Sequence, residues 1–120
     1  MLAALVQALD RQGGPVRVIE THISAVLLAG EFAYKLKKPV DLGFVDFTRP
    51  SARRHFCHEE LRLNRRLAPQ LYLAVVAITG RRDAPRLGGG GRAIDYAVKM
   101  RRFPAAAQFD RLLQHGQLGP

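Results

Sequence analysis

Three closely spaced strand-like segments near the N-terminus constrain the fold most strongly. They are rich in β-branched and apolar residues and cover 16–19, 23–29 and 32–38. Gly30 and Glu31 are a turn signal, which predicts a hairpin between 26–29 and 32–36. Parallel strands need longer crossovers than these connections provide, so the sheet is predicted to be antiparallel.

Segments whose apolar residues recur at helical spacing lie on both sides of this strand cluster in the sequence. Apolar residues at helical spacing predict a first helix over 1–12, which Gly13-Gly14-Pro15 ends. The longest helix is expected at about 51–68, before Pro69. Its apolar face is expected to carry Phe56, Glu60, Leu63 and Leu67.

The second half of the chain predicts two further strands, at 71–78 and 94–103. Between them, the Gly-rich segment 80–92 is interpreted as a loop, and a short helix is expected at 105–113. The fold class is therefore α+β: a five-stranded antiparallel sheet with one long helix packed on it, plus short terminal helices.

Charge and cysteine content narrow the function classes. The 120 residues contain 19 Lys and Arg against 10 Asp and Glu, a formal charge of +9, which favours an anionic partner. A single cysteine, Cys57, excludes an intrachain disulfide and a thiolate zinc site, and we predict no metal site. No apolar run approaches the roughly 20 residues of a membrane span, and the N-terminus lacks a basic signal-peptide region. We therefore expect a cytoplasmic location and no membrane partner.

Lys35, Lys37 and Lys38 form the first candidate site. Lys35 and Lys37 are two residues apart on a predicted strand, so they share one face, where a lysine can hold a phosphate as a point charge. The alternative is a solvated strand edge that discourages aggregation.

Glu60 is the second candidate, because it lies between Phe56 and Leu63 on the apolar face of the long helix. A buried carboxylate is costly unless it is paired, and the strand lysines are its expected partners. The alternative places Glu60 at the border of the buried face. Its neighbour Glu59 is expected to face solvent.

Basic residues on the long helix offer a different function, the binding of nucleic acid phosphates. They are Arg53, Arg54, Arg62, Arg65 and Arg66. A solvated helix face is the alternative, and no named nucleic-acid motif accompanies them. Gly88–Gly91 matches neither the P-loop nor the GxGxxG pattern.

Four segments together resemble a known family. They are ETHISAVLLAG, AYKLKKPVDLGFVDF, RRHFCHEELRLNRRLAPQLYL and YAVKMRRFP. They are similar to the start of bacterial aminoglycoside-phosphotransferase-like proteins of the protein-kinase-like fold, many of which continue into a P-loop ATPase or kinase domain. The resemblance runs from about residue 20 to residue 113.

The resemblance implies a site for ATP with Mg²⁺. Lys35 would hold the nucleotide phosphates, with Lys37 as the alternative, and Glu60 would be its ion-pair partner, with Glu59 as the alternative. The turn 21–25 would cover the phosphates, although it contains no glycine. Met100 would belong to the hinge beside the adenine, at 100–103, with Arg101 and Arg102 at its mouth.

The same resemblance implies three parts: an N-terminal helix at 1–14, a kinase-like small lobe at 15–104, and the truncated start of a large lobe at 105–120. The catalytic Asp and the Mg²⁺ ligands of such enzymes lie in the large lobe, and no HxD…N motif is present. We therefore expect no catalytic residue in this chain, an unknown acceptor, and weak or no ATP binding by these residues alone. The expected partners are a nucleotide and the missing large lobe or a downstream P-loop domain. Alternatives are a basic nucleic-acid-binding module, or a noncatalytic interaction domain that dimerises through the exposed lobe face.

Overall fold

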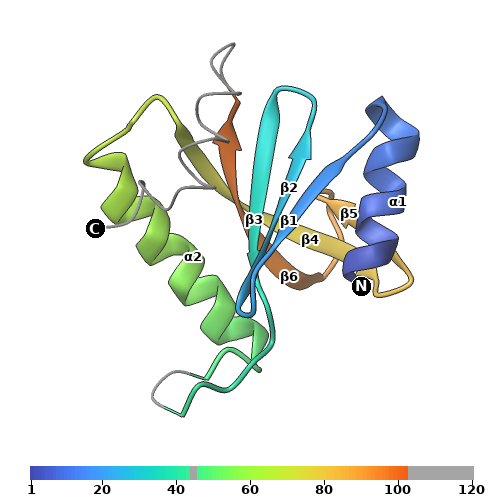
Figure 1. Cartoon of the computed structure of the whole chain (residues 1–120). Helices are drawn as coiled ribbons and strands as arrows, with labels where there is room; N and C mark the ends of the chain where they lie inside the picture. The colour runs from blue at the N-terminus through green and yellow to red at the C-terminus, as the bar shows by residue number, and fades with distance from the viewer. Residues whose placement is uncertain (44–45, 103–120) are drawn as a thin grey trace.

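The computed structural model describes residues 1–43 and 46–102. These residues form an α+β fold of two helices and a curled antiparallel sheet (Figure 1). In chain order, the elements are α1 (Leu2–Gly13), β1 (Arg17–Glu20), β2 (Ser24–Ala29), β3 (Phe32–Lys37), α2 (Pro50–Arg65), β4 (Tyr72–Arg81), β5 (Ala84–Leu87) and β6 (Ala93–Arg101).

The sheet has six strands in the order β1-β2-β3-β6-β4-β5, so the prediction of five strands is wrong. The additional strand is β5, which lies inside the segment interpreted as a loop and pairs with the end of β4. It is a short edge strand, a position where Pro85 is tolerated because one side of the strand needs no hydrogen-bond partner. Pro85 and the glycines that follow conceal the strand in the sequence.

The hairpin predicted from Gly30 and Glu31 is confirmed. Strands β2 and β3 pair in antiparallel register from Ala29↔Phe32 to Ser24↔Lys37, joined by a two-residue loop. Gly30 has φ 60°, and a glycine at the first central position suits the tight turns that match strand twist. The turn fixes the register and therefore decides which residues of β3 share a face.

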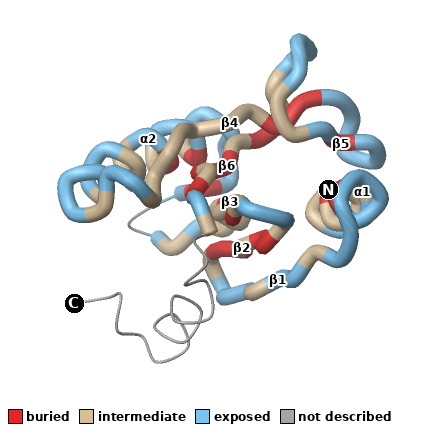
Figure 2. Tube along the Cα trace, turned by 90° about the horizontal axis from the view of Figure 1, so that it is seen from above, coloured by how far each residue is buried: buried red, intermediate tan, exposed pale blue. Residues whose placement is uncertain are grey.

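The two faces of the sheet carry separate hydrophobic clusters, one under each helix. On the α1 face, Leu5 and Leu9 pack with Leu27 and Leu36. On the α2 face, Cys57 packs with residues of the three central strands, Leu28, Ala33, Val98 and Met100. Figure 2 shows the buried residues concentrated between the helices. Alternation along each strand thus gives β3 one face toward each helix.

The buried face of α2 differs from the predicted one. Leu63 and Leu67 are 51% and 86% exposed, whereas Arg53 and Cys57 are buried. The helix is rotated relative to our expectation because Arg53 has a buried partner on the sheet, described below. Pro50 occupies the first turn of α2, where a missing N–H costs little.

The N-terminal helix predicted at 1–12 is confirmed as α1. The helix predicted at 105–113 lies outside the described residues. Within residues 1–43 and 46–102, no helix is long and apolar enough to cross a membrane.

Candidate functional site

Lys35 lies on β3, a central strand of the sheet, where it pairs with Val26 of β2 and Val98 of β6. Ala33, Lys35 and Lys37 alternate onto the face covered by α2. The predicted sharing of one face by Lys35 and Lys37 is therefore confirmed, and both side chains extend toward the helix.

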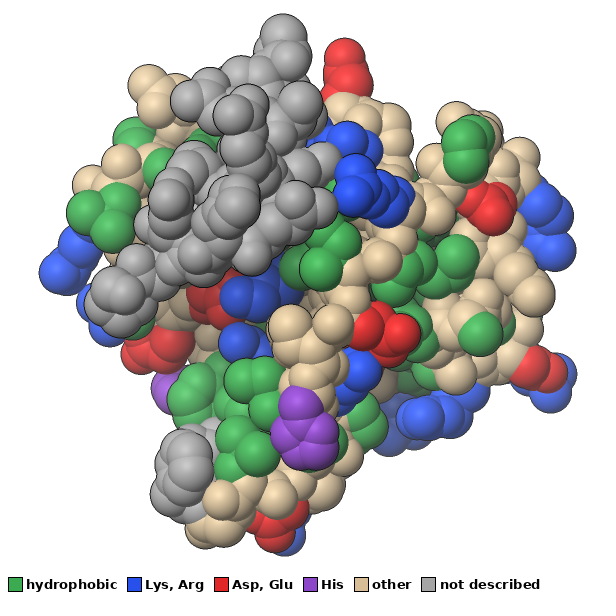
Figure 3. Space-filling view, viewed as in Figure 1, with side chains coloured by type: hydrophobic (Ala, Val, Ile, Leu, Met, Phe, Trp, Pro, Cys, Tyr) green, Lys and Arg blue, Asp and Glu red, His purple; other side chains and the backbone are tan. Residues whose placement is uncertain are grey.

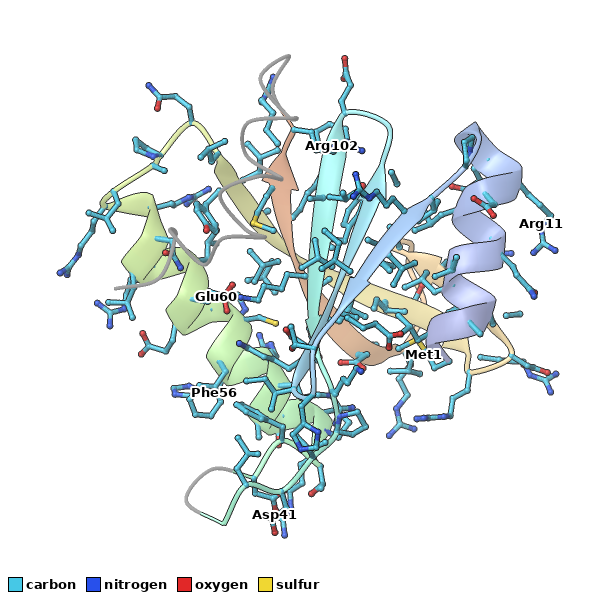
Figure 4. The ribbon with its side chains drawn as sticks, in the orientation of Figure 1. Met1, Arg11, Asp41, Phe56, Glu60 and Arg102 are labelled. Carbon is cyan, nitrogen blue, oxygen red and sulfur yellow. The ribbon has the colours of Figure 1, made fainter. Side chains whose placement is uncertain are left out.

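Glu60 lies on the side of α2 that faces the sheet (Figure 4) and bridges both lysines. Its Oε2 lies 3.2 Å from Lys35 Nζ, and its Oε1 lies 3.0 Å from Lys37 Nζ. The predicted ion pair is present, and both lysines considered as the partner of Glu60, Lys35 and Lys37, take part in it. The Glu60 side chain is 15% exposed, so the solvent screens the cluster only partly.

This Lys35–Glu60–Lys37 cluster has a net charge of +1 and spare hydrogen-bond donors. Each lysine ammonium has three N–H groups. Among the described residues, each lysine directs one of these N–H groups to the Glu60 carboxylate. Lys37 and Glu60 also line a cavity of about 540 Å³ with Phe56, Leu63 and Asn64. An anionic group that enters this cavity meets the Lys37 ammonium, already positioned by the Glu60 carboxylate, together with the side chains of Glu59 and Arg62.

Arg53 fixes the N-terminal end of α2 to the sheet. Its Nε donates to Asp95 Oδ1 of β6 at 2.9 Å, and its Nη1 donates to the carbonyl oxygens of Phe47 and Thr48 at 2.7 and 3.0 Å. Both charged side chains are nearly buried, at 4% and 8% exposure. The sequence offered Arg53 only as a candidate for binding nucleic acid phosphates and did not offer Asp95 at all, since their pairing joins positions 42 residues apart.

Arg65 ties the other end of α2 to β4. Its Nε donates to the carbonyl oxygen of Tyr72 at 3.0 Å, and its Nη2 donates to that of Leu73. Glu60 lies between these two attachments. The helix therefore has little freedom to withdraw Glu60 from the lysines.

The turn at Thr21 joins β1 and β2 close to the lysine-bearing end of β3. The Thr21 hydroxyl oxygen accepts hydrogen bonds from the backbone N–H groups of Ile23 and Ser24, at 3.3 and 3.1 Å. The side chain thereby occupies amides that a glycine-rich turn leaves free for phosphate. Phosphate binding here depends on lysine side chains more than on backbone amides.

Met100, Arg101 and Arg102 lie where β6 ends. Met100 is 6% exposed and packs in the α2-face cluster with Ala33. The backbone N–H of Arg101 donates to the Leu71 carbonyl, and that of Arg102 donates to the Glu31 carbonyl. These two amides are committed to the sheet.

Glu59 faces solvent, as predicted, and pairs with Arg62 at 2.8 Å. Lys38 points away from the cluster and pairs with Glu20 at 3.0 Å. Of the helix arginines considered for nucleic acid binding, Arg53, Arg62 and Arg65 are engaged within the protein.

Two groups near Glu60 have perturbed acidities. Burial raises the pKa of Cys57 to about 11, and the Glu60 carboxylate contributes to the same shift. Burial also raises the pKa of Tyr72, again with a contribution from Glu60. Cys57 is thus a protonated packing residue at neutral pH rather than a nucleophile.

The described residues contain no group of three or more His, Cys, Asp or Glu side chains placed to hold a metal ion.

Among curated proteins, the chain is similar to the uncharacterized protein Rv2004c of Mycobacterium tuberculosis and the uncharacterized protein Mb2027c of Mycobacterium bovis. Each is 40% identical over 88 residues, which cover 73% of this chain. The chain spans 16% of the length of each relative. No protein-family model matches the chain, and no solved structure matches it.

Proposed function

We propose that this domain is the nucleotide-binding small lobe of an aminoglycoside-phosphotransferase-like protein with a kinase-like fold. The observation that carries the proposal is the bridge from Glu60 of α2 to Lys35 of the central strand β3. In kinase-like enzymes, this pair positions the lysine on the ATP phosphates. Here Lys37 joins the same carboxylate, which adds a second ammonium to the phosphate site.

The surroundings of the pair support the same function. Ala33 precedes Lys35 by two residues on the same face, and Met100 packs with it. Both side chains are buried, at 1% and 6% exposure, so they support Lys35 from within the α2-face cluster. Because the backbone N–H groups of Arg101 and Arg102 are committed to the sheet, the nucleobase would rely on other backbone groups.

The catalytic half of the cleft would come from another part of a longer protein. We assign the exposed Leu63 and the cavity beside Glu60 to the surface that would contact such a lobe. In the intact protein, the two lobes would transfer the γ-phosphoryl group of MgATP to a hydroxyl acceptor. The relatives are long enough to contain such a lobe, since the chain matches a small fraction of their length.

The test is an ATP titration of the 120-residue chain, followed by NMR of its backbone amides. We expect millimolar binding with shifts near Lys35 and Glu60, and its loss in Lys35→Met. Lys99→Met is the matched control, because Lys99 stacks over Phe32 away from Glu60. Equal binding by the wild type and Lys35→Met would overturn the proposal.

A further inference from the structure

A second cavity, of about 470 Å³, lies at the end of the sheet where both helices begin. Leu2 and Pro50, the first residues of α1 and α2, line it, together with Ala25 and Leu36 of the β2–β3 pair. Leu36 faces the α1 side of the sheet, opposite Glu60. The cavity shares only Lys37 with the proposed phosphate site, because neither Lys35 nor Glu60 lines it, and its volume suits a small molecule.

The lining of this cavity is strongly basic. Four cations, Lys37, Lys38, Arg53 and Arg82, contribute to it, against one carboxylate, Asp95. Basic side chains gather below the N-terminus in Figure 3. Within the described residues, Arg82 has no ion-pair partner, and the pair between Lys38 and Glu20 is at the surface, where such pairs contribute little. Both of these cations are available to an anion.

The helix ends add to this positive potential. Neither α1 nor α2 has an acidic residue in its first turn, and neither has a side-chain cap. The partial positive charge of each helix N-terminus is thus not neutralised locally.

Arg53 and Asp95 provide fixed hydrogen-bonding groups in the cavity wall. Arg53 uses Nε and Nη1 in its contacts, so Nη2 has no partner among the described residues, although the side chain is 96% buried. Asp95 Oδ1 accepts from Arg53 and from the Tyr96 amide, which leaves Oδ2 without a described donor. A buried donor and a buried acceptor without partners are costly unless water or a ligand satisfies them.

We propose that this cavity binds a small oxyanion that also carries a hydroxyl group, such as a phosphate monoanion or a hydroxy acid. The oxyanion accepts from Arg53 Nη2 and is held by Arg82 and Lys38, while its hydroxyl donates to Asp95 Oδ2. Any apolar part of the ligand contacts Ala25 and Leu36. The proposal does not depend on the nucleotide function of Lys35 and Glu60.

The experiment measures binding of inorganic phosphate at pH 6.5 to the 120-residue chain, by NMR at constant ionic strength. We expect saturable shifts at residues lining the cavity, and weaker binding of sulfate, because sulfate has no hydroxyl to donate to Asp95. Glycolate, compared with acetate, tests the carboxylate form of the same chemistry. A glycolate preference without phosphate binding assigns the site to hydroxy acids.

Two surface variants identify the site without disturbing the core. The double variant Lys38→Gln/Arg82→Gln should weaken binding by about tenfold or more, since it removes two charge-assisted contacts. Arg81→Gln is the matched control, because Arg81 is exposed, pairs with Asp83 and lies outside the cavity lining. It should change binding by less than about twofold. The absence of saturable binding of both phosphate and glycolate, or equal losses in the two variants, would overturn the proposal.

Discussion

Replacing Arg53 with Met should destabilise the fold strongly, because its partner Asp95 is buried. The change leaves Asp95 as an unpaired carboxylate at 8% exposure and removes the donor to the Phe47 carbonyl. Breaking a buried ion pair by removing one partner costs about 3–5 kcal/mol. Loss of the donor to the Phe47 carbonyl adds to this cost, whereas water that enters the adjacent cavity lowers it. We therefore expect the free energy of unfolding to fall by about 4 kcal/mol. Such a loss is a large part of the stability of a domain of this size.

The assay is urea denaturation followed by circular dichroism for the wild type, Arg53→Met, Asp95→Leu and the double variant. Because the double variant leaves no buried charge, it should be more stable than Arg53→Met by at least about 2 kcal/mol. If Arg53→Met fails to fold and the double variant folds, the reasoning is also supported. A fall in the free energy of unfolding of less than about 1 kcal/mol for Arg53→Met would refute the assignment of a buried Arg53–Asp95 ion pair. Losses that add in the double variant would refute it as well.

Five further substitutions test the site, the sheet and the burial of Cys57 by the same assay. Glu60→Gln should cost about 1 kcal/mol, because two partly buried lysines lose their carboxylate, whereas Glu59→Gln at the surface should cost less than about 0.5 kcal/mol. Gly80→Ala should lower the free energy of unfolding by at least about 2 kcal/mol, because φ is +89° and the added Cβ would lie 2.7 Å from the Ala84 carbonyl oxygen. Gly30→Ala should lower it by about 1 kcal/mol, because φ is +60° but the added Cβ would meet no other atom within 4 Å. The pKa of Cys57 rises from 9.0 to about 11 on folding, so the unfolded state loses its thiol proton first as the pH rises. The free energy of unfolding should therefore fall between about pH 9 and pH 11, by up to about 1.4 kcal/mol per pH unit. Cys57→Ala should remove this contribution to the pH dependence. Wild-type and Cys57→Ala curves that stay parallel above pH 9 would contradict the assigned burial.

Local patterns in the sequence predicted the central part of the site. The turn at Gly30 fixes the β2–β3 register, and the two-residue spacing of Lys35 and Lys37 then places both lysines on one face. Glu60 could be assigned to them because a carboxylate on an apolar helix face needs a cationic partner. These inferences depend on residues close in sequence, or on one dominant electrostatic requirement.

The sequence did not predict features that depend on distant contacts. Burial of Arg53 requires Asp95, and this pair orients α2 so that Leu63 faces solvent. Strand β5 forms because an adjacent strand offers it an edge, which outweighs the unfavourable propensity of Pro85. The basic cavity likewise brings together residues from β3, α2 and the β4–β5 turn.

The central claim is that Lys35 and Lys37, held by Glu60, bind nucleotide phosphates. ATP that carries a reactive acyl group on its γ-phosphate acylates lysines beside the bound phosphates, and mass spectrometry of the labelled protein identifies them. We predict labelling of Lys35 or Lys37 that unmodified ATP suppresses, with little labelling of Lys99, which lies over Phe32. Equal labelling of Lys35, Lys37 and Lys99, without protection by ATP, would contradict the account.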